Sequence, residues 1–169
     1  MHEVGELPTA GLVDPTASPY IVPGGDPLPF LASVHASTRG VVVGIALSGA
    51  GRTLRHRLRA LTRTIVYHAE GWQVVRHVLV VVQGARPATV REQRSLSSFA
   101  RHAHVQLQMR LALDVCVTVI TIDGQPRPEE ISRRIEERMR TTPLEGWFVT
   151  EWGSIASRPI SDLVAEALL

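Results

Sequence analysis

Two uninterrupted apolar runs constrain the fold more than any other feature of this 169-residue sequence. "RGVVVGIALSG" covers residues 39–49 and "WQVVRHVLVVVQG" covers residues 72–84. A strand with one polar face alternates, so nearly continuous apolar runs indicate strands that are buried on both faces. Between them, residues 51–71 place four aliphatic side chains on one helical face: Leu54, Leu58, Leu61 and Ile65. A strand, a helix and a second strand in this order predict an α/β domain.

A segment of a different kind follows. A helix is expected to begin near Thr89, and from residue 103 to residue 119 every odd-numbered residue is apolar. Period-two alternation predicts a strand with one polar face, although this one is too long for an ordinary strand. We therefore expect one long bent strand, or two strands joined at a bulge near Ala112. A half-polar strand favours an antiparallel or edge position, and so the sheet is predicted to be mixed.

The last third of the chain continues the alternation. "EEISRRIEERMR" predicts a solvated helix, "GWFVTEWG" a short last strand and "SDLVAEALL" a C-terminal helix. The predicted fold class is α/β, a layered β-α-β-α-β-α-β-α domain over residues 38–169. Its mixed sheet is expected to contain the long bent strand, and residues 1–37 are expected to form an extended arm.

The arm is defined by proline. Six of the eleven prolines fall within the first thirty residues, where they favour extended or turning backbone over helix. One hypothesis is a disordered terminus. The other is an arm that docks on its own domain or on a neighbouring copy, because a solvated linker has little use for apolar side chains. The candidate docking residues are Tyr20, Ile21, Val22, Leu28, Phe30 and Leu31.

Charge divides the chain into three parts. Residues 1–37 carry four acids and no arginine, and residues 38–112 carry twelve arginines and two acids, a net charge of +10. Residues 113–169 are acidic again, with six arginines and ten acids. Such asymmetry suggests contacts between unlike regions, within the chain or between copies. All eighteen basic residues are arginine, which is typical of GC-rich coding, so the absence of lysine at one site carries little meaning.

The turn between the first strand and the first helix matches the P-loop pattern except for its lysine. Residues 46–53 read Ala-Leu-Ser-Gly-Ala-Gly-Arg-Thr, and Asp123 after a later apolar strand is a candidate metal-binding acid. Arginine does not simply replace the compact lysine ammonium, which argues against a working NTPase. An anion site at the helix N-terminus and a plain turn both remain open. The candidate anion-binding residues are Ser48, Gly49, Gly51, Arg52 and Thr53.

The first helix also presents a basic face. Arg55, Arg59 and Arg63 lie away from its aliphatic stripe and, with Arg52, could contact several phosphates or an acidic protein surface. Aromatic residues are few, so no base-stacking platform is visible. His102 and His104 would share a strand face without further ligands, and Cys116 lies in an apolar run. We therefore expect no metal, no cofactor and no catalytic residue.

These features favour a non-enzymatic role. The leading hypothesis is an assembly or adaptor subunit that associates with itself or with a protein partner through its arm and basic middle region. The alternative is an anion-binding domain for nucleotide or nucleic-acid phosphate, and a hydrolase with an unrecognised site is a third class. No apolar run has membrane-spanning length and no secretory signal is present, so we expect a cytoplasmic protein without membrane contact.

Overall fold

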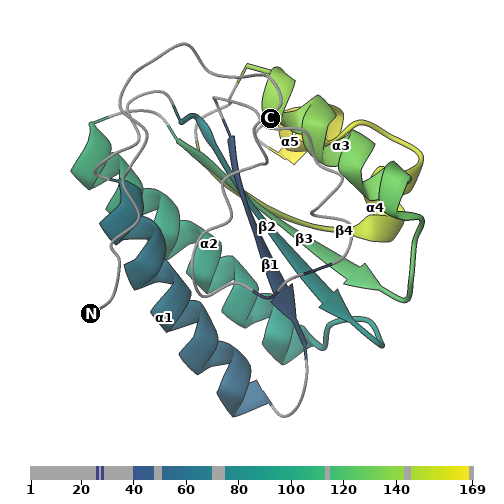
Figure 1. Ribbon diagram of the computed structural model, residues 1–169, viewed down its shortest axis with the longest axis horizontal. Helices are drawn as coiled ribbons and strands as arrows, with labels where there is room; N and C mark the ends of the chain where they lie inside the picture. The colour runs from purple at the N-terminus through teal and green to yellow at the C-terminus, as the bar shows by residue number, and fades with distance from the viewer. Residues whose placement is uncertain are drawn as a thin grey trace, which may run out of the picture.

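The computed structural model describes residues 26, 28, 40–47, 51–69, 75–112, 115–142 and 146–167. Strands and helices alternate through this part of the chain (Figure 1), which confirms the α/β class. The elements are β1 (Gly40–Ala46), α1 (Gly51–Ala69), β2 (His77–Gly84), α2 (Val90–Leu111), β3 (Cys116–Asp123), α3 (Pro128–Arg140), β4 (Trp147–Glu151), α4 (Trp152–Ala156) and α5 (Ile160–Ala167). None of the described helices combines the length and apolar character that crossing a bilayer requires.

The four strands form one sheet in the order β1-β2-β3-β4, and each neighbouring pair is parallel. Val41 lies beside Val78, and Val78 in turn beside Val117. The prediction of a mixed sheet is therefore wrong. The apolar runs have a simple explanation in this arrangement, because helices cover both faces of a parallel sheet and leave its central strands no polar side.

The expected long strand over residues 103–119 is also wrong. Helix α2 continues to Leu111, ends at Ala112 in the left-handed conformation (φ 48°), and β3 begins only at Cys116. The segment also fits a helical pattern, because its buried side chains follow the spacing i, i+4, i+7, i+11. They are Leu96, Ala100, Ala103 and Leu107. Val105 and Met109, which the strand hypothesis placed on the same inner face, are exposed.

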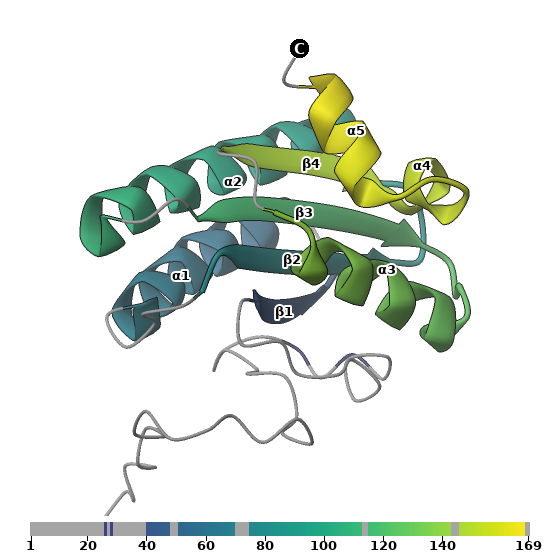
Figure 2. The same cartoon turned by 90° about the horizontal axis from the view of Figure 1, so that it is seen from above.

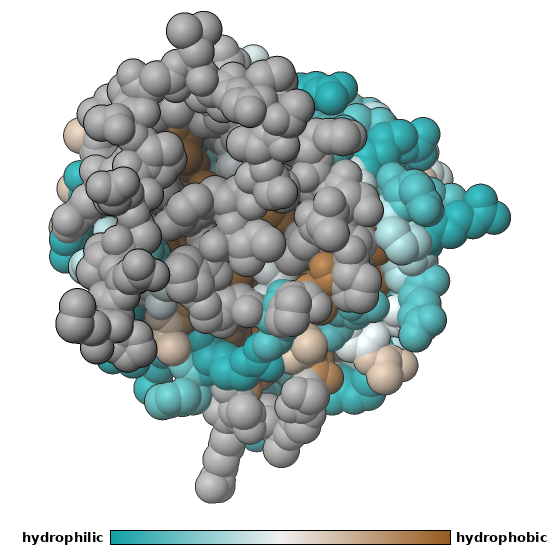
Figure 3. Space-filling model, in the orientation of Figure 1, coloured by the Kyte–Doolittle hydropathy of each residue, from teal (hydrophilic) through white to brown (hydrophobic). Residues whose placement is uncertain are grey.

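Helices cover both faces of the sheet (Figure 2), and a hydrophobic core lies on each face. On one face, α1 and α2 pack against alternate strand residues such as Val43, Val80 and Val119. On the other, α3, α4 and α5 pack against the intervening residues such as Val42, Leu79 and Ile120. The outer side of α3 is hydrophilic and lies on the right in the space-filling view (Figure 3).

The third connection has an unusual hand. Each strand lies beside the previous one in the same direction across the sheet, yet α1 and α2 lie on one face and α3 on the other. The β3–α3–β4 connection therefore has the opposite hand to the first two. Those two are right-handed, like nearly all such crossovers, and the third is left-handed (Figures 1 and 2).

Two residues of the N-terminal segment contact the outer edge of β1. The Asp26 N–H donates to the Gly44 carbonyl at 2.8 Å, and the Ala46 N–H donates to Asp26 Oδ2 at 2.5 Å. Leu28 is buried in the same core as Val42. These contacts cover polar backbone groups on an edge strand, which are otherwise free to pair with another chain.

Candidate anion-binding groove between α1 and α2

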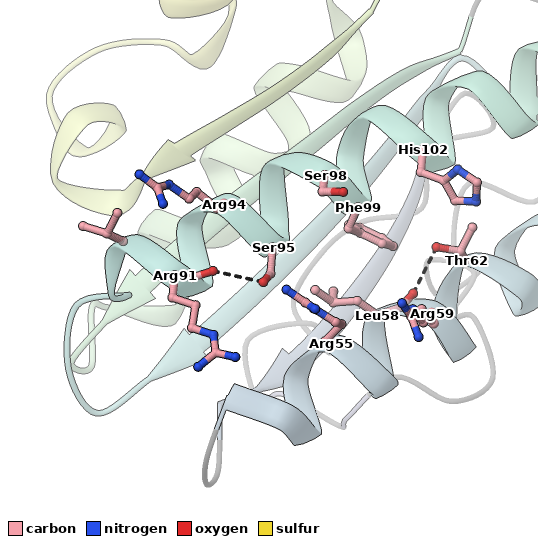
Figure 4. Close-up of a pocket in the computed structure, with 11 residues that line it drawn as sticks. Arg55, Leu58, Arg59, Thr62, Arg91, Arg94, Ser95, Ser98, Phe99 and His102 are labelled. Atoms are coloured by element: carbon pink, nitrogen blue, oxygen red, sulfur yellow. Dashed lines mark hydrogen bonds between the residues drawn. The ribbon is translucent and has the colours of Figure 1, made fainter.

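A groove of about 790 Å³ runs between α1 and α2 on the outer side of the domain (Figure 4). Four of its lining side chains are arginines, namely Arg55 and Arg59 from α1 with Arg91 and Arg94 from α2. None of the described residues that line it is acidic. They are Arg55, Leu58, Arg59, Thr62, Val90, Arg91, Arg94, Ser95, Ser98, Phe99 and His102. The groove is therefore a strongly basic surface with hydroxyl groups along it.

Helix α1 supplies one wall because its two faces differ. Leu54, Leu58, Leu61 and Ile65 are all buried against the sheet, as their spacing predicts. Arg55, Arg59 and Thr62 follow at i, i+4 and i+7, so they lie on the side of α1 that faces α2. The Thr62 hydroxyl donates to the Leu58 carbonyl at 3.0 Å, which fixes this side chain against its own helix.

Helix α2 supplies the other wall, and a capping box fixes its start. Glu92 N–H donates to the Thr89 hydroxyl at 3.3 Å, and Thr89 N–H donates to Glu92 Oε2 at 2.8 Å. Arg86 closes the arrangement with two hydrogen bonds to the Glu92 carboxylate, at 2.9 and 3.0 Å. The hydrogen bonds from Arg86 lower the pKa of Glu92 to about 2, although burial of the carboxylate acts in the opposite direction. Glu92 therefore stays ionised and is neutralised locally, outside the groove.

The groove arginines lack acidic partners. Within the described residues, none of Arg55, Arg59, Arg91 and Arg94 lies in an ion pair or donates a side-chain hydrogen bond. Six other described arginines do lie within ion-pair distance of a carboxylate: Arg57, Arg86, Arg127, Arg134, Arg140 and Arg158. Four like charges gathered without a counter-charge repel one another, and an anion in the groove relieves that repulsion.

The helix ends add to the positive potential. Both helices follow parallel strands, so their N-terminal ends lie at the same edge of the sheet (Figure 1). Arg55, Arg91 and Arg94 lie near these ends, where the helix dipole is positive. Along α2, the rise from Arg91 to His102 is about 16 Å at roughly 1.5 Å per residue. The groove is thus long enough for several phosphates in a row.

The floor of the groove is apolar, whereas its rim is charged. Leu58 and Phe99 are buried at the base, while His102 lies at one end and is exposed. Arg55, Arg59 and Arg91 lie along the space between the helices, and Arg94 points away from α1 at the rim (Figure 4). Phe99, with 5% of its surface exposed, offers no free ring for a stacked base. The groove presents charge and hydroxyls but no aromatic platform.

The structure separates the residues of the predicted basic face. Arg55 and Arg59 line the groove, whereas Arg63 is exposed on α1 outside it. Gly51, Arg52 and Thr53 form the start of α1, and their side chains lie outside the described part, as do Ser48 and Gly49. The predicted anion site at the glycine turn therefore remains a prediction.

Sequence reasoning missed the half of the groove that belongs to α2. Arg91, Arg94, Ser95, Ser98 and His102 lie in the helix that is expected to begin near Thr89, but no local pattern places that helix beside the first one. Two crossover helices on one face of a parallel sheet lie side by side, so their outward-facing residues meet. The packing of α2 against α1 brings these five residues beside Arg55 and Arg59.

A second polar cleft lies at the carboxyl ends of β2 and β3. Their following helices leave to opposite faces, and in open α/β sheets ligands bind at such a switch point. Arg86, Asp123 and Glu151 are among its lining residues, but its volume is only about 10 Å³. The Gly124 N–H, which donates to the Gly84 carbonyl at 3.2 Å, joins its two sides. A space of this size holds at most one water molecule, which favours the large groove as the binding site.

The remaining predicted residues lie apart from the groove. Asp123 is exposed at the end of β3, separated from β1 by the whole of β2. His104 lies on α2, not on a strand, and its Nδ1 donates to the Val115 carbonyl at 2.8 Å. Cys116 is buried at the start of β3. Among the described residues, no group of three His, Cys, Asp or Glu side chains could hold a metal ion.

The predicted arm-docking residues fall mostly outside the described part of the chain. This holds for Tyr20, Ile21, Val22, Phe30 and Leu31, whereas Leu28 is buried against the β1 side of the second core. Burial raises the pKa of Asp26, but the Ala46 N–H and the Arg57 guanidinium outweigh it, and the pKa lies below its ordinary value.

Comparison of the chain with family models, curated proteins and solved structures yields no match.

Proposed function

We propose that this domain binds the phosphate backbone of nucleic acid in the groove between α1 and α2. The observation that supports the proposal is a groove with three arginines along it and Arg94 at its rim, none of which has an acidic partner among the described residues. Guanidinium groups bind phosphate in a bidentate fashion, and each neutralised phosphate releases counterions. The net charge of +10 over residues 38–112 adds long-range attraction.

The shape of the groove favours a phosphate chain over a single nucleotide. Arg55 and Arg59 are one helical turn apart, about 6 Å along the axis, and Arg91 and Arg94 are about 4.5 Å apart. Successive phosphates of one duplex strand rise about 3.4 Å. Charges spread over two helices therefore match several phosphates better than one compact group. Because contacts with phosphates carry no sequence information, binding through these arginines is expected to show no preference for base sequence.

The experiment is fluorescence anisotropy with a labelled duplex of about 20 base pairs, a single strand of equal length and ATP–Mg²⁺. Four phosphate contacts give a slope of about −3.6 in log affinity against log salt, so affinity falls roughly 100-fold between about 50 and 200 mM salt. Arg55→Glu with Arg91→Glu should abolish duplex binding. Arg101→Glu, on the exposed side of α2 outside the groove, is the matched control and should weaken it only slightly. Absence of duplex and single-strand binding at about 50 mM salt contradicts the proposal.

Assembly through the N-terminal arm is the second candidate function. The contacts of Asp26 and Leu28 with β1 lie within one chain, and we infer that the same contacts between two chains hold copies together. Light scattering of the full chain at low salt, from micromolar to high micromolar concentration, tests it. A mass that stays at one chain throughout contradicts self-association.

A further inference from the structure

The outer edge of β1 recognises a short acidic-apolar segment through three kinds of contact. One backbone hydrogen bond joins the Asp26 N–H to the Gly44 carbonyl, and the Ala46 N–H donates to the Asp26 carboxylate. The Asp26 carboxylate also pairs with Arg57 of α1, which in turn donates to the Ala46 carbonyl at 2.6 Å. Leu28 then enters the apolar core that contains Val42. Main-chain pairing with side-chain anchors is how extended peptides dock on sheet edges.

Gly44 makes this docking possible. A β-carbon at this position would lie 2.7 Å from the Asp26 carbonyl oxygen and 2.8 Å from Leu28 Cγ. Both distances are shorter than real Cβ contacts, so a larger residue at position 44 forces the segment to move away from β1. The edge of β1 is therefore shaped to receive Asp26 and Leu28.

We propose that this edge is an interaction surface for the same Asp26–Leu28 segment of a second copy of the chain. The contacts that hold the segment are identical whichever chain supplies it, which makes exchange of a terminal element between copies energetically cheap. Eleven residues separate Leu28 from β1, and they span up to about 36 Å when extended, enough to reach a neighbouring molecule. The chain's own segment competes for the same edge at an effective concentration on the order of millimolar.

Two full-length variants, each unable to close on itself, test the exchange. The acceptor carries Asp26→Asn and Leu28→Ala, so that its arm is disabled and its β1 edge is open. The donor carries Gly44→Val, so that its edge is blocked and its arm is intact. The expected result by sedimentation velocity is a heterodimer at micromolar concentration, while each variant alone remains a monomer. A donor that also carries Asp26→Asn and Leu28→Ala is the control and should form none.

Failure of a variant to fold does not leave the question open. If circular dichroism shows the donor unfolded, a labelled peptide of residues 18–37 replaces it, with a peptide carrying the two arm substitutions as control. If the acceptor is unfolded, the same peptides are titrated into the wild-type chain at millimolar excess. The native peptide should bind about tenfold more tightly or better. A mixture that sediments as two monomers, or equal binding of both peptides, overturns the proposal. These measurements do not involve the groove arginines, so their outcome is independent of nucleic-acid binding.

Discussion

The Asp26 carboxylate pairs with the Arg57 guanidinium across the end of β1. Because Arg57 also donates to the Ala46 carbonyl, one arginine joins the N-terminal segment, the last residue of β1 and the second turn of α1. Arg55 and Arg59, on either side of Arg57 in sequence, face the groove instead. Helix α1 thus uses neighbouring arginines for two purposes, one structural and the others available to a ligand.

Arg59 and Arg63 are predicted to behave differently although they are one turn apart on the same helix. Arg59→Ala should weaken duplex binding about three- to tenfold and reduce the salt slope by about one, because Arg59 lines the groove. Arg63→Ala should change both quantities little, because Arg63 lies outside it. Anisotropy at two or more salt concentrations measures the difference. Equal effects of the two substitutions would show that the ligand contacts the whole exposed face of α1 and not the groove alone.

Leu107 and Met109 distinguish helix from strand over residues 103–111. Leu107 is 0% exposed and Met109 is 77% exposed. Leu107→Ala should therefore lower the free energy of unfolding by about 3 kcal/mol, and Met109→Ala should change it by less than about 0.5 kcal/mol. Urea denaturation followed by circular dichroism measures both. Similar losses for the two variants would contradict the helix.

Glu92 makes stability depend on acid pH. Its folded-state pKa of about 2 lies below the ordinary value of 4.5, so its stabilising contribution is full above pH 4.5 and is lost as the pH falls toward 2. Allowing for the exposure of Arg86, we expect a contribution of about 2 kcal/mol. Glu92→Gln should remove most of this pH dependence. Thermal unfolding of both proteins between pH 2 and pH 6 measures it, and parallel curves would show that the Arg86–Glu92 pair contributes nothing.

The sulfur of Cys116 accepts a hydrogen bond from the buried guanidinium of Arg138. Arg138 is 1% exposed, its Nη2 donates to Cys116 Sγ at 3.1 Å, and its Nε has no hydrogen-bond partner among the described residues. Cys116→Val removes the acceptor and should destabilise the fold by about 1–3 kcal/mol. Cys116→Ser retains an acceptor of similar size and should cost less. Chemical denaturation of the two variants gives the comparison, and a more stable valine variant would show that the sulfur contact is dispensable.

The order of elements was predictable because the signals of β1, α1 and β2 are strong and agree with one another. Continuous valine runs have few alternatives to a buried strand, and Leu54, Leu58 and Leu61 fit only a helix. The prediction of a strand over residues 103–119 failed for a physical reason. Ala103 and Leu107, which are buried, satisfy both a period of two and a period of 3.6, and local pattern alone does not choose between them.

Only the α1 side of the candidate groove was predictable from the sequence. Arg55 and Arg59 stand out in a basic helix, but their partners on α2 become visible only once the two helices are known to lie side by side. The role of Asp26 has no local signal, since its partner Arg57 is 31 residues away in the sequence. Contacts of this kind depend on the path of the whole chain.

The left-handed return from β3 to β4 determines which surfaces the protein can offer. A right-handed return would have laid α3 against the free flank of α2, where Gln93 now reaches Glu151 at 2.9 Å and Arg94 faces solvent. The same four strands in the same order would then carry a third helix over one end of the basic surface. The hand of the β3–α3–β4 connection therefore determines how accessible the basic surface is. A chain with the opposite hand would keep the same sheet but leave less room for a large ligand to approach.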